Sequence, residues 1–368
     1  MRIGVPREIK VMEFRVGMVP DGVGVLVAQG HEVHVETGAG MGCGFDDDAY
    51  SNAGARVGSV EDVWESELVV KVKEPQSPEI ARLHRDQTLF TYLHLAASPK
   101  VTQGLLDAGV LAIAYETIRT PDGAFPVLAP MSEVAGRLAA QIGATLLQKD
   151  QRGKGLLLGG VPGVERGKVT VLGAGTVGIN AVRVAHALGA EVDVLDVDLK
   201  RLTYLYDIFS GDLNTLYSNP ANIARSVISS DLLIGGVYLS GQRAPVLVTE
   251  EMVGEMEPGS VVVDVAVDQG GCVETIHPTT HADPTYLVHD VVHYGVANMP
   301  GAVPRTATYA LTNTTLPFVE RMADLGVEEA IRSDSALASG VNVWRGEIVC
   351  DGVAESLELP HRPLDELL

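Results

Sequence analysis

The sequence has few cysteines, no long hydrophobic run and far fewer basic than acidic residues. Its three cysteines, Cys43, Cys272 and Cys350, lie far apart and form no CxxC pair, which is typical of a reducing cytosol rather than of a disulfide framework. No apolar run is long enough to span a bilayer, and the first ten residues lack the charged-then-apolar pattern of a signal peptide. We therefore expect a cytoplasmic protein with no membrane partner.

Acidic residues dominate the charge, with 48 Asp and Glu against 27 Lys and Arg and a formal net charge of −21. Nucleic acid is excluded as a partner because its phosphates would be repelled. The same balance fits either a salty cytoplasm or simply a very soluble surface. At 368 residues the chain is long enough for two domains with separate cores.

A glycine-rich stretch stands at the centre of the chain. Residues 169–172 are an apolar run typical of a buried strand, and GAGTVG follows at 173–178. Apolar positions then recur at helical spacing as far as Leu188, and a second apolar run at 192–195 ends at Asp196. This strand, glycine loop, helix, strand and acid order predicts a dinucleotide site. The alternative is a glycine-rich turn that binds nothing.

Each part of this motif has a physical role in such a site. Gly173 permits the tight turn, Gly175 lets backbone N–H groups approach a pyrophosphate, and Gly178 allows close packing of helix and strand. The N-terminal end of the helix favours the negative charge of the pyrophosphate. Asp196 is placed to accept hydrogen bonds from a ribose, which favours NAD over NADP, although Lys200 and Arg201 nearby weaken that preference.

The rest of the chain alternates between predicted strands and helices. In the first third, apolar runs at 2–5, 31–36, 68–73, 88–92 and 111–116 are separated by helical patterns such as 22–30 and 101–108. Later we expect a helix capped by Ser132, strands at 232–236, 260–267 and 287–296, and a helix at 306–325 that returns to the first domain. Such alternation predicts mostly parallel, doubly wound sheets.

The predicted fold class is therefore α/β with two doubly wound domains. A Rossmann dinucleotide-binding domain at 127–304 is expected to be inserted into a discontinuous substrate domain at 1–126 and 305–368. The first boundary is placed at the segment between Pro126 and Pro130.

Ligands of open parallel sheets bind at the carboxyl ends of the strands. The polar residues expected there are Lys73, His94, Glu116, Asp196, Asp268 and Asn298, with Arg15 in a loop near the first strand. A guanidinium matches a carboxylate bidentately, and the ordinary pKa of histidine suits proton transfer near neutral pH.

Four of these candidates also have a structural alternative. Arg15 could form a surface salt bridge with Glu13 or Glu8, and Lys73 could form an exposed pair with Lys71 on one strand face. A lone histidine in an apolar run, such as His94, is commonly a core residue. Asp268 could simply initiate the turn at the following Gly-Gly pair.

Two histidine pairs have the spacing of helical zinc ligands, His277 with His281 and His289 with His293. The first pair encloses a proline and turn-type threonines, and the second lies in the run predicted as one strand, where residues i and i+4 are about 13 Å apart. We therefore predict no metal site.

Long motifs in fixed order give the sequence a family resemblance. RIGVPREIK opens the chain, and KVKEP, FTYLHLAA, PMSEVAGRLAAQIGA, GAGTVG, DVAVDQGG and YGVANMPGAVPRTATYALTN follow. The sequence resembles the NAD-dependent alanine dehydrogenases of the hexameric bacterial type over nearly its whole length. The resemblance implies reversible oxidation of L-alanine to pyruvate and ammonium by a homo-hexamer.

The resemblance also implies a role for individual residues. His94 and Asp268 match the catalytic residues, and Arg15 and Lys73 match the pair that holds the substrate. The positions that match NAD contacts are Ser132, Gly173, Gly175, Gly178, Asp196, Arg201, Ser218, Val267, Ala297, Asn298, Met299 and Pro300.

Three other readings remain open on sequence alone. The chain also resembles the NAD-binding subunit of a nicotinamide nucleotide transhydrogenase in its opening and layout. A related dehydrogenase of the saccharopine type would need a roomier pocket. A non-catalytic protein that senses NADH would bind the cofactor without oxidising any amino acid.

Overall fold

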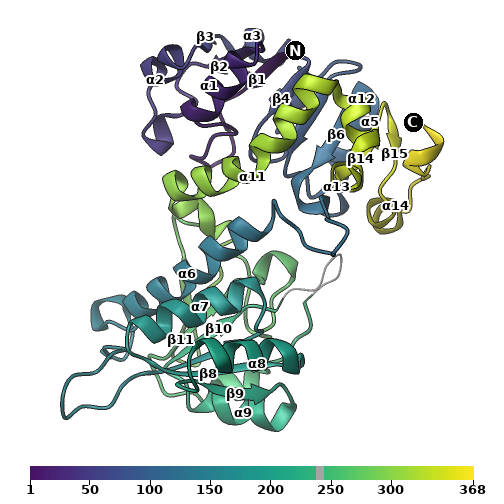
Figure 1. Ribbon diagram of the computed structural model, residues 1–368. Helices are drawn as coiled ribbons and strands as arrows, with labels where there is room; N and C mark the ends of the chain where they lie inside the picture. The colour runs from purple at the N-terminus through teal and green to yellow at the C-terminus, as the bar shows by residue number, and fades with distance from the viewer. Residues whose placement is uncertain (238–243) are drawn as a thin grey trace. The chain divides into compact units, whose positions relative to one another are not determined.

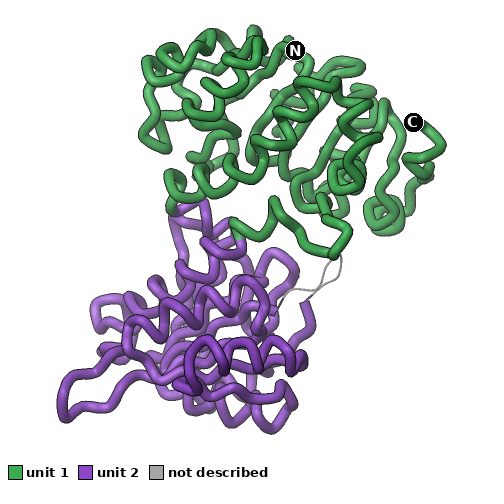
Figure 2. Tube along the Cα trace, in the orientation of Figure 1, with its two compact units in different colours: residues 1–131, 303–368 green, residues 132–302 purple. Residues whose placement is uncertain are grey.

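The computed structural model describes residues 1–237 and 244–368. The chain forms two compact units (Figure 2), one made of Met1–Met131 with Val303–Leu368 and the other of Ser132–Ala302. The units divide at 131/132 and 302/303, and the predicted domain boundaries were 126/127 and 304/305. Each unit contains one sheet with helices beside it, and the predicted fold class is confirmed.

Unit 1 holds an eight-stranded sheet in the order β15-β14-β6-β5-β4-β1-β2-β3. Strands β1 to β6 are parallel, while β14 pairs antiparallel with β6 and β15 antiparallel with β14. The strands are β1 Arg2–Val5, β2 Glu32–Glu36, β3 Arg56–Gly58, β4 Leu68–Val70, β5 Thr88–Thr91, β6 Leu111–Ala114, β14 Val341–Trp344 and β15 Glu347–Ile348.

The helices of unit 1 come from both ends of the chain (Figure 1). They are α1 Pro20–Ala28, α2 Asp47–Asn52, α3 Val60–Trp64, α4 Ser77–Ile80, α5 Pro99–Ala108, α11 Pro304–Leu325, α12 Val327–Ser333, α13 Ser335–Gly340 and α14 Asp351–Leu357. Prolines at the start of α1, α5 and α11 fit the first turn, where no backbone N–H is needed. Gly30, with φ of 91°, ends the region of α1 as predicted.

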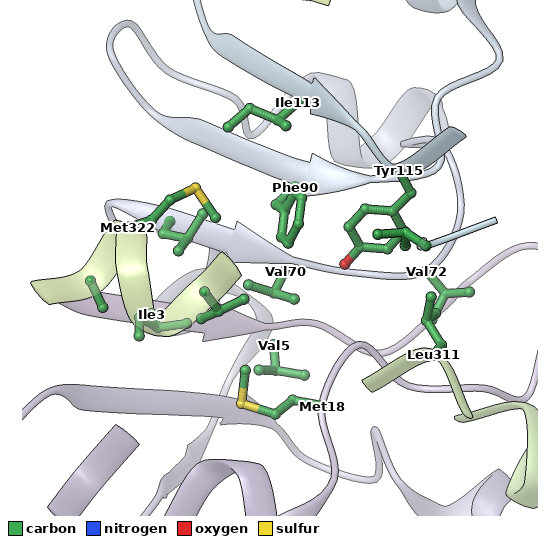
Figure 3. Close-up of a cluster of buried hydrophobic side chains, with 14 of the residues drawn as sticks. Ile3, Val5, Met18, Val70, Val72, Phe90, Ile113, Tyr115, Leu311 and Met322 are labelled. Atoms are coloured by element: carbon green, nitrogen blue, oxygen red, sulfur yellow. The ribbon is translucent and has the colours of Figure 1, made fainter. Parts of the chain in front are cut away.

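Strands β4 to β6 of unit 1 are buried on both faces, and their side chains alternate between two apolar clusters. One face carries Val70, Phe90 and Ile113, which belong to the same cluster as Leu311 and Met322 of α11 (Figure 3). The other face carries Val69, Leu89 and Ala112, which cluster with Leu105 of α5. Helix α11, from the C-terminal segment of unit 1, thus supplies core residues to a sheet whose strands β1 to β6 come from the N-terminal third of the chain.

Unit 2 holds a seven-stranded sheet in the order β12-β13-β11-β10-β7-β8-β9, parallel except for β12. Its strands are β7 Lys168–Leu172, β8 Glu191–Asp196, β9 Asn214–Tyr217, β10 Leu232–Gly235, β11 Val261–Asp264, β12 Thr285–Val288 and β13 Val291–Tyr294. Its helices are α7 Thr176–Ala187, α8 Leu199–Ile208, α9 Pro220–Ile228 and α10 Glu250–Gly254, together with most of α6 Ala129–Leu146.

Three predicted elements were wrong in detail. The helix α6 begins at Ala129, so Ser132 lies inside it and is no N-cap, because Pro130 is tolerated in a first turn. Residues 287–296 are no single strand, because His289 and Asp290 adopt φ of 51° and 60° and make a two-residue hairpin turn. The strand predicted to reach Asp268 ends at Asp264.

Within the described residues, none of the helices combines the length and apolar character needed to cross a lipid bilayer.

Candidate functional site

The glycine loop of unit 2 has the geometry that its sequence predicts. Gly173 has φ of 93°, and its N–H donates to the Leu195 carbonyl at 2.7 Å, which ties the end of β7 to β8. A Cβ on Gly178 would lie 1.7 Å from the Gly173 carbonyl oxygen, so only glycine fits where α7 leaves the strand. Among the described residues, a Cβ on Gly175, the N-cap of α7, would meet only the Arg201 guanidinium, at 3.7 Å. The loop therefore has the tight turn and open backbone that a pyrophosphate requires.

Asp196 lies at the end of β8 and is buried, with 8% of its surface exposed. Its Oδ2 accepts from the Ala174 N–H at 2.6 Å, and its Oδ1 accepts from the Asp198 N–H at 2.8 Å. Since each carboxylate oxygen can accept more than one hydrogen bond, these contacts leave acceptor capacity for a ribose. Asp196 thus also fixes the glycine loop against β8, a role that sequence reasoning did not foresee.

Two other predicted cofactor residues lie beside Asp196. The Ser218 N–H donates to the Asp196 carbonyl at 3.0 Å, immediately after β9. The Arg201 guanidinium lies 4.0 Å from Asp196 Oδ2 and 3.6 Å from Asp198 Oδ2, while its side chain is 57% exposed. The carboxylates of Asp196 and Asp198 therefore face Arg201, the cation that was expected to weaken the preference for NAD over NADP.

Helix α6, which carries Ser132, packs against α7. Gly136, four residues later on the same face of α6, packs so closely against α7 that a Cβ there would lie 2.2 Å from the Val177 carbonyl oxygen. The first turns of α6 in unit 2 and the first turn of α7 are therefore neighbours.

The remaining unit 2 candidates follow two neighbouring parallel strands. Val267 and Asp268 form the short 3-10 helix Val267–Gln269 after β11, and Asp268 is exposed. Residues 297–300 follow β13, the parallel partner of β11. Asn298 has φ of 65°, and its carbonyl accepts from His281 Nε2 at 3.1 Å and from the Gly301 N–H at 2.9 Å. These segments share the carboxyl edge of the sheet with the glycine loop.

In unit 1, Arg15 is a buried residue and not the partner of a surface salt bridge. Only 2% of its surface is exposed, and its Nε and Nη2 donate to the two oxygens of Glu13 at 2.7 and 2.6 Å. Burial alone would lower the pKa of Arg15, but the Glu13 carboxylate outweighs it and raises the pKa, so the guanidinium stays charged. Its Nη1 lies 3.2 Å from the sulfur of Met131.

Lys73 follows the end of β4, and the predicted pairing of Lys71 and Lys73 on one strand face was wrong because β4 ends at Val70. Lys71 is fully buried, 3.0 Å from Glu8 and 3.2 Å from Glu79. Lys73 is half-buried, and its carbonyl accepts from Thr91 at 2.9 Å and from the Lys71 ammonium at 3.0 Å. Burial and the nearby Arg15 charge lower the pKa of Lys73.

Sequence reasoning missed the role of Glu8, which it considered only as a surface partner of Arg15. Its Oε1 accepts from the backbone N–H groups of Val72 and Lys73 at 2.6 and 3.3 Å. The signal that could have revealed it is Lys71, which directly follows three buried apolar residues. A lysine at such a position is buried and therefore needs carboxylate partners.

His94 is exposed, so the alternative of a core histidine was wrong. Its side chain is 47% exposed and lies parallel to the Tyr92 ring, with centroids 5.9 Å apart. Its backbone is left-handed, with φ of 49°, and its N–H donates to Glu116 at 2.6 Å. His94 Nδ1 lies 3.8 Å from the same carboxylate oxygen. Glu116 therefore holds the backbone that presents the imidazole to solvent.

The histidine pairs singled out by spacing are engaged elsewhere. His277 stacks on Tyr286, His289 pairs with Glu250 at 2.9 Å, and His293 is buried against Thr275. Among the residues that the structure describes, no group of three or more His, Cys, Asp or Glu is placed to hold a metal ion.

The chain matches the models of two domains of one protein family, which together cover most of its length. Residues 4–135 match the model of the N-terminal domain of alanine dehydrogenase/PNT, and residues 139–351 match that of the C-terminal domain. The alanine dehydrogenase of Bacillus subtilis is 53% identical over 370 residues, covering 100% of this chain and 98% of its own.

Solved structures agree with this relationship. An L-alanine dehydrogenase superposes with a TM-score of 0.95 at 53% identity, covering 97% of this chain and 99% of its own. A transhydrogenase from Sinorhizobium meliloti gives 0.82 at 26% identity, covering 95% and 99%.

Proposed function

Because the chain belongs to the alanine dehydrogenase/PNT family, we propose that it catalyses the reversible oxidative deamination of L-alanine to pyruvate and ammonia with NAD. The observation that carries this proposal is the 53% identity to an alanine dehydrogenase along the whole chain, against 26% to a transhydrogenase. Neither a transhydrogenase subunit nor an NADH sensor has a comparable observation in its favour.

The cofactor is a nicotinamide dinucleotide, and we propose NAD rather than NADP. The turn and open backbone of the glycine loop support this proposal, as do the contacts of Arg201 and Ser218 with Asp196 and the packing of α6, which carries Ser132, against α7. The buried carboxylate of Asp196 would repel a 2′-phosphate, and Arg201 already faces Asp196 and Asp198. When bound, NAD accepts the hydride that leaves Cα of alanine.

The residues of unit 1 supply binding and proton transfer in this proposal. Arg15, fixed in its plane by Glu13, and the Lys73 ammonium hold the substrate carboxylate and carbonyl oxygen, which orients the Cα–H bond. Loss of hydride leaves an iminium, to which water adds before ammonia leaves. His94 accepts and returns the protons of these steps, because an imidazole nitrogen can take up a proton and donate it again and its side chain is exposed.

In unit 2, we propose roles for Asp268 and for the segment 297–300. The Asp268 carboxylate stabilises the cationic ammonium or iminium and helps to orient the attacking water. Val267, Ala297, Asn298, Met299 and Pro300 line the cofactor.

We further propose a cytoplasmic homo-hexamer. The three cysteines are free, which fits a reducing compartment. Leu157, Val161 and Val164 are 68%, 55% and 63% exposed within one connecting segment, which another subunit would cover. Light scattering after size-exclusion chromatography measures the assembly, and a monomer would contradict this proposal.

Absorbance of NADH tests the function directly. We expect NADH to form from L-alanine and NAD at alkaline pH and to be consumed with pyruvate and ammonium near neutral pH, with NADP much weaker. The His94→Ala variant should lose about 10³-fold in kcat and keep its affinity for NADH, while His84→Ala, at another exposed histidine, should behave like the wild type. NADH binding without oxidation of any amino acid would support a sensor instead.

A further inference from the structure

The loop that carries Asp268 closes around another carboxylate. Asp264, the last residue of β11, is fully buried, with no exposed surface. Its Oδ1 accepts from the Ala266 N–H at 2.9 Å, and its Oδ2 accepts from the N–H groups of Cys272 and Val273 at 2.7 and 3.1 Å. The donors stand on both sides of residues 267–271, so one carboxylate ties the entry of the loop to its exit.

The surroundings of Asp264 leave it little freedom to move. A Cβ on Gly235, in the neighbouring strand β10, would lie 2.9 Å from Asp264 Oδ1, and a Cβ on Gly271 would lie 2.9 Å from Oδ2. Gly270 and Gly271 have φ of 94° and 73°, conformations that other residues rarely adopt. Two close glycines and two left-handed turns therefore let the loop wrap tightly around the carboxylate.

Asp268 depends on this arrangement for its position. It lies two residues after Ala266 and four before Cys272, on a single turn of 3-10 helix that is too short to hold its own shape. A buried carboxylate that receives three backbone N–H bonds is a strong and directional anchor. Loss of that anchor would displace the exposed Asp268 side chain while leaving the strand beneath it in place.

We propose that Asp264 is a positioning residue for the reaction, which fixes the loop from both ends and so holds the Asp268 carboxylate at its working place. This inference rests on the proposed function of Asp268. It differs from a general structural role because it acts through one other residue, and a double-mutant cycle can isolate that dependence.

The experiment compares Asp264→Asn, Asp268→Asn and the double variant. Asparagine has the size of aspartate, but its NH2 group must replace either Oδ1 or Oδ2. In the first case it faces the Ala266 N–H and in the second the N–H groups of Cys272 and Val273, so at least one accepting contact is lost. We expect Asp264→Asn to lower kcat for alanine by about 100-fold, the loss that a displacement of about 1 Å can cause, with an unchanged NADH dissociation constant. In the Asp268→Asn background the same change should cost almost nothing further.

A matched control separates burial from position. Asp193 in β8 is 3% exposed and accepts hydrogen bonds from Asn214 and Ser226 at 2.8 and 2.9 Å. Unlike Asp264, it does not hold the loop that contains Asp268. Asp193→Asn should leave kcat near the wild-type value. If Asp264→Asn fails to fold, Ala266→Pro replaces it in both backgrounds, since Ala266 has φ of −84° and proline removes only its donor.

The outcomes distinguish the two proposals. Equal fold losses from the Asp264 or Ala266 change in both backgrounds would overturn the positioning role, because the effect would not pass through Asp268. An Asp268→Asn variant with full activity would instead refute the catalytic role of Asp268. A wild-type chain that oxidises no alanine would refute the proposed function itself.

Discussion

The two units share one strand order and use it in opposite ways. The orders are β3-β2-β1-β4-β5-β6 in unit 1 and β9-β8-β7-β10-β11-β13 in unit 2. In both, the first strand lies between the second and the fourth, so the strand order changes direction beside it. At this point unit 2 passes directly from β7 through residues 173–175 into α7. Unit 1 instead inserts residues 6–19 between β1 and α1, with Glu8, Glu13 and Arg15 among them. The same topology thus offers backbone groups in one unit and charged side chains in the other.

The difference follows from the size and charge of what each unit is proposed to bind. A pyrophosphate is large and doubly charged, so a helix N-terminus and several backbone N–H groups suffice, provided that no side chain intervenes. A small carboxylate needs a directional partner such as a guanidinium. Burying that guanidinium requires a counter-charge, which explains why Glu13 accompanies Arg15.

The largest expected effect comes from breaking the charged pair of unit 1. Arg15→Met removes the guanidinium from the buried Glu13 carboxylate, and loss of one partner of a buried pair costs about 3–5 kcal/mol of unfolding free energy. Denaturant unfolding measures this loss, and pyruvate should no longer bind at millimolar concentration. Arg7→Met, at an exposed arginine 3.8 Å from Glu36, should change neither quantity. If the folded Arg15→Met variant binds pyruvate as well as the wild type does, unit 1 does not use this charged side chain for recognition, and the contrast with unit 2 fails.

A smaller effect is expected from closing the backbone site of unit 2. Gly178→Ala forces a methyl group against the Gly173 carbonyl, and such overpacking costs about 1–3 kcal/mol. Titration of NADH fluorescence should show weaker binding. Gly352→Ala in α14 is the control, because no atom of residues 1–237 or 244–368 lies within 4 Å of an added Cβ, and it should stabilise the protein by about 0.5–1 kcal/mol. Wild-type NADH affinity in Gly178→Ala would show that close packing of α7 is not required.

The smallest effect concerns the stability of unit 1. Since the pKa of Lys73 is lowered in the folded protein, the unfolded chain binds more protons between that pKa and the ordinary value of 10.5. Burial of the Lys73 ammonium therefore lowers the free energy of unfolding by its full amount below the folded-state pKa. This loss of stability disappears as the pH rises to 10.5.

Lys73→Met should accordingly raise the melting temperature at neutral pH, by an amount that shrinks at alkaline pH, while it weakens substrate binding. Thermal scans across pH measure the trend, with exposed Lys100→Met as the control. A melting temperature below that of the wild type at neutral pH would contradict it.

The sequence predicted well the features that depend on neighbouring residues. The glycine loop, its strand and Asp196 form one contiguous motif, and Gly30 marks the end of a helix by its own conformation. The family resemblance extended this local reading to the whole chain and is confirmed. The hairpin turn at His289 and Asp290 was missed because neither residue is glycine or asparagine, the usual signals of such turns.

The anchoring carboxylates could not be predicted in the same way. Glu8, Glu116 and Asp264 each accept hydrogen bonds from backbone groups, and for Glu8 and Glu116 those groups lie far along the chain. Such contacts exist only once the strands are paired, so spacing gives no sign of them. Asp264 ends β11, and the backbone groups that it accepts from belong to the loop after that strand.

The discontinuous make-up of unit 1 has a consequence for synthesis on the ribosome. Unit 2 is one continuous segment and can fold as soon as it has emerged. Unit 1 can complete its fold only later, because α11 and β14 are translated after unit 2. Helix α11 supplies Leu311 and Met322 to the core, and β14 pairs with β6, which would otherwise be an edge strand. Until then the nascent chain exposes an unpaired strand edge and an uncovered apolar sheet face, the two features most prone to aggregation. We therefore expect the N-terminal third to be the part of the nascent chain that chaperones bind.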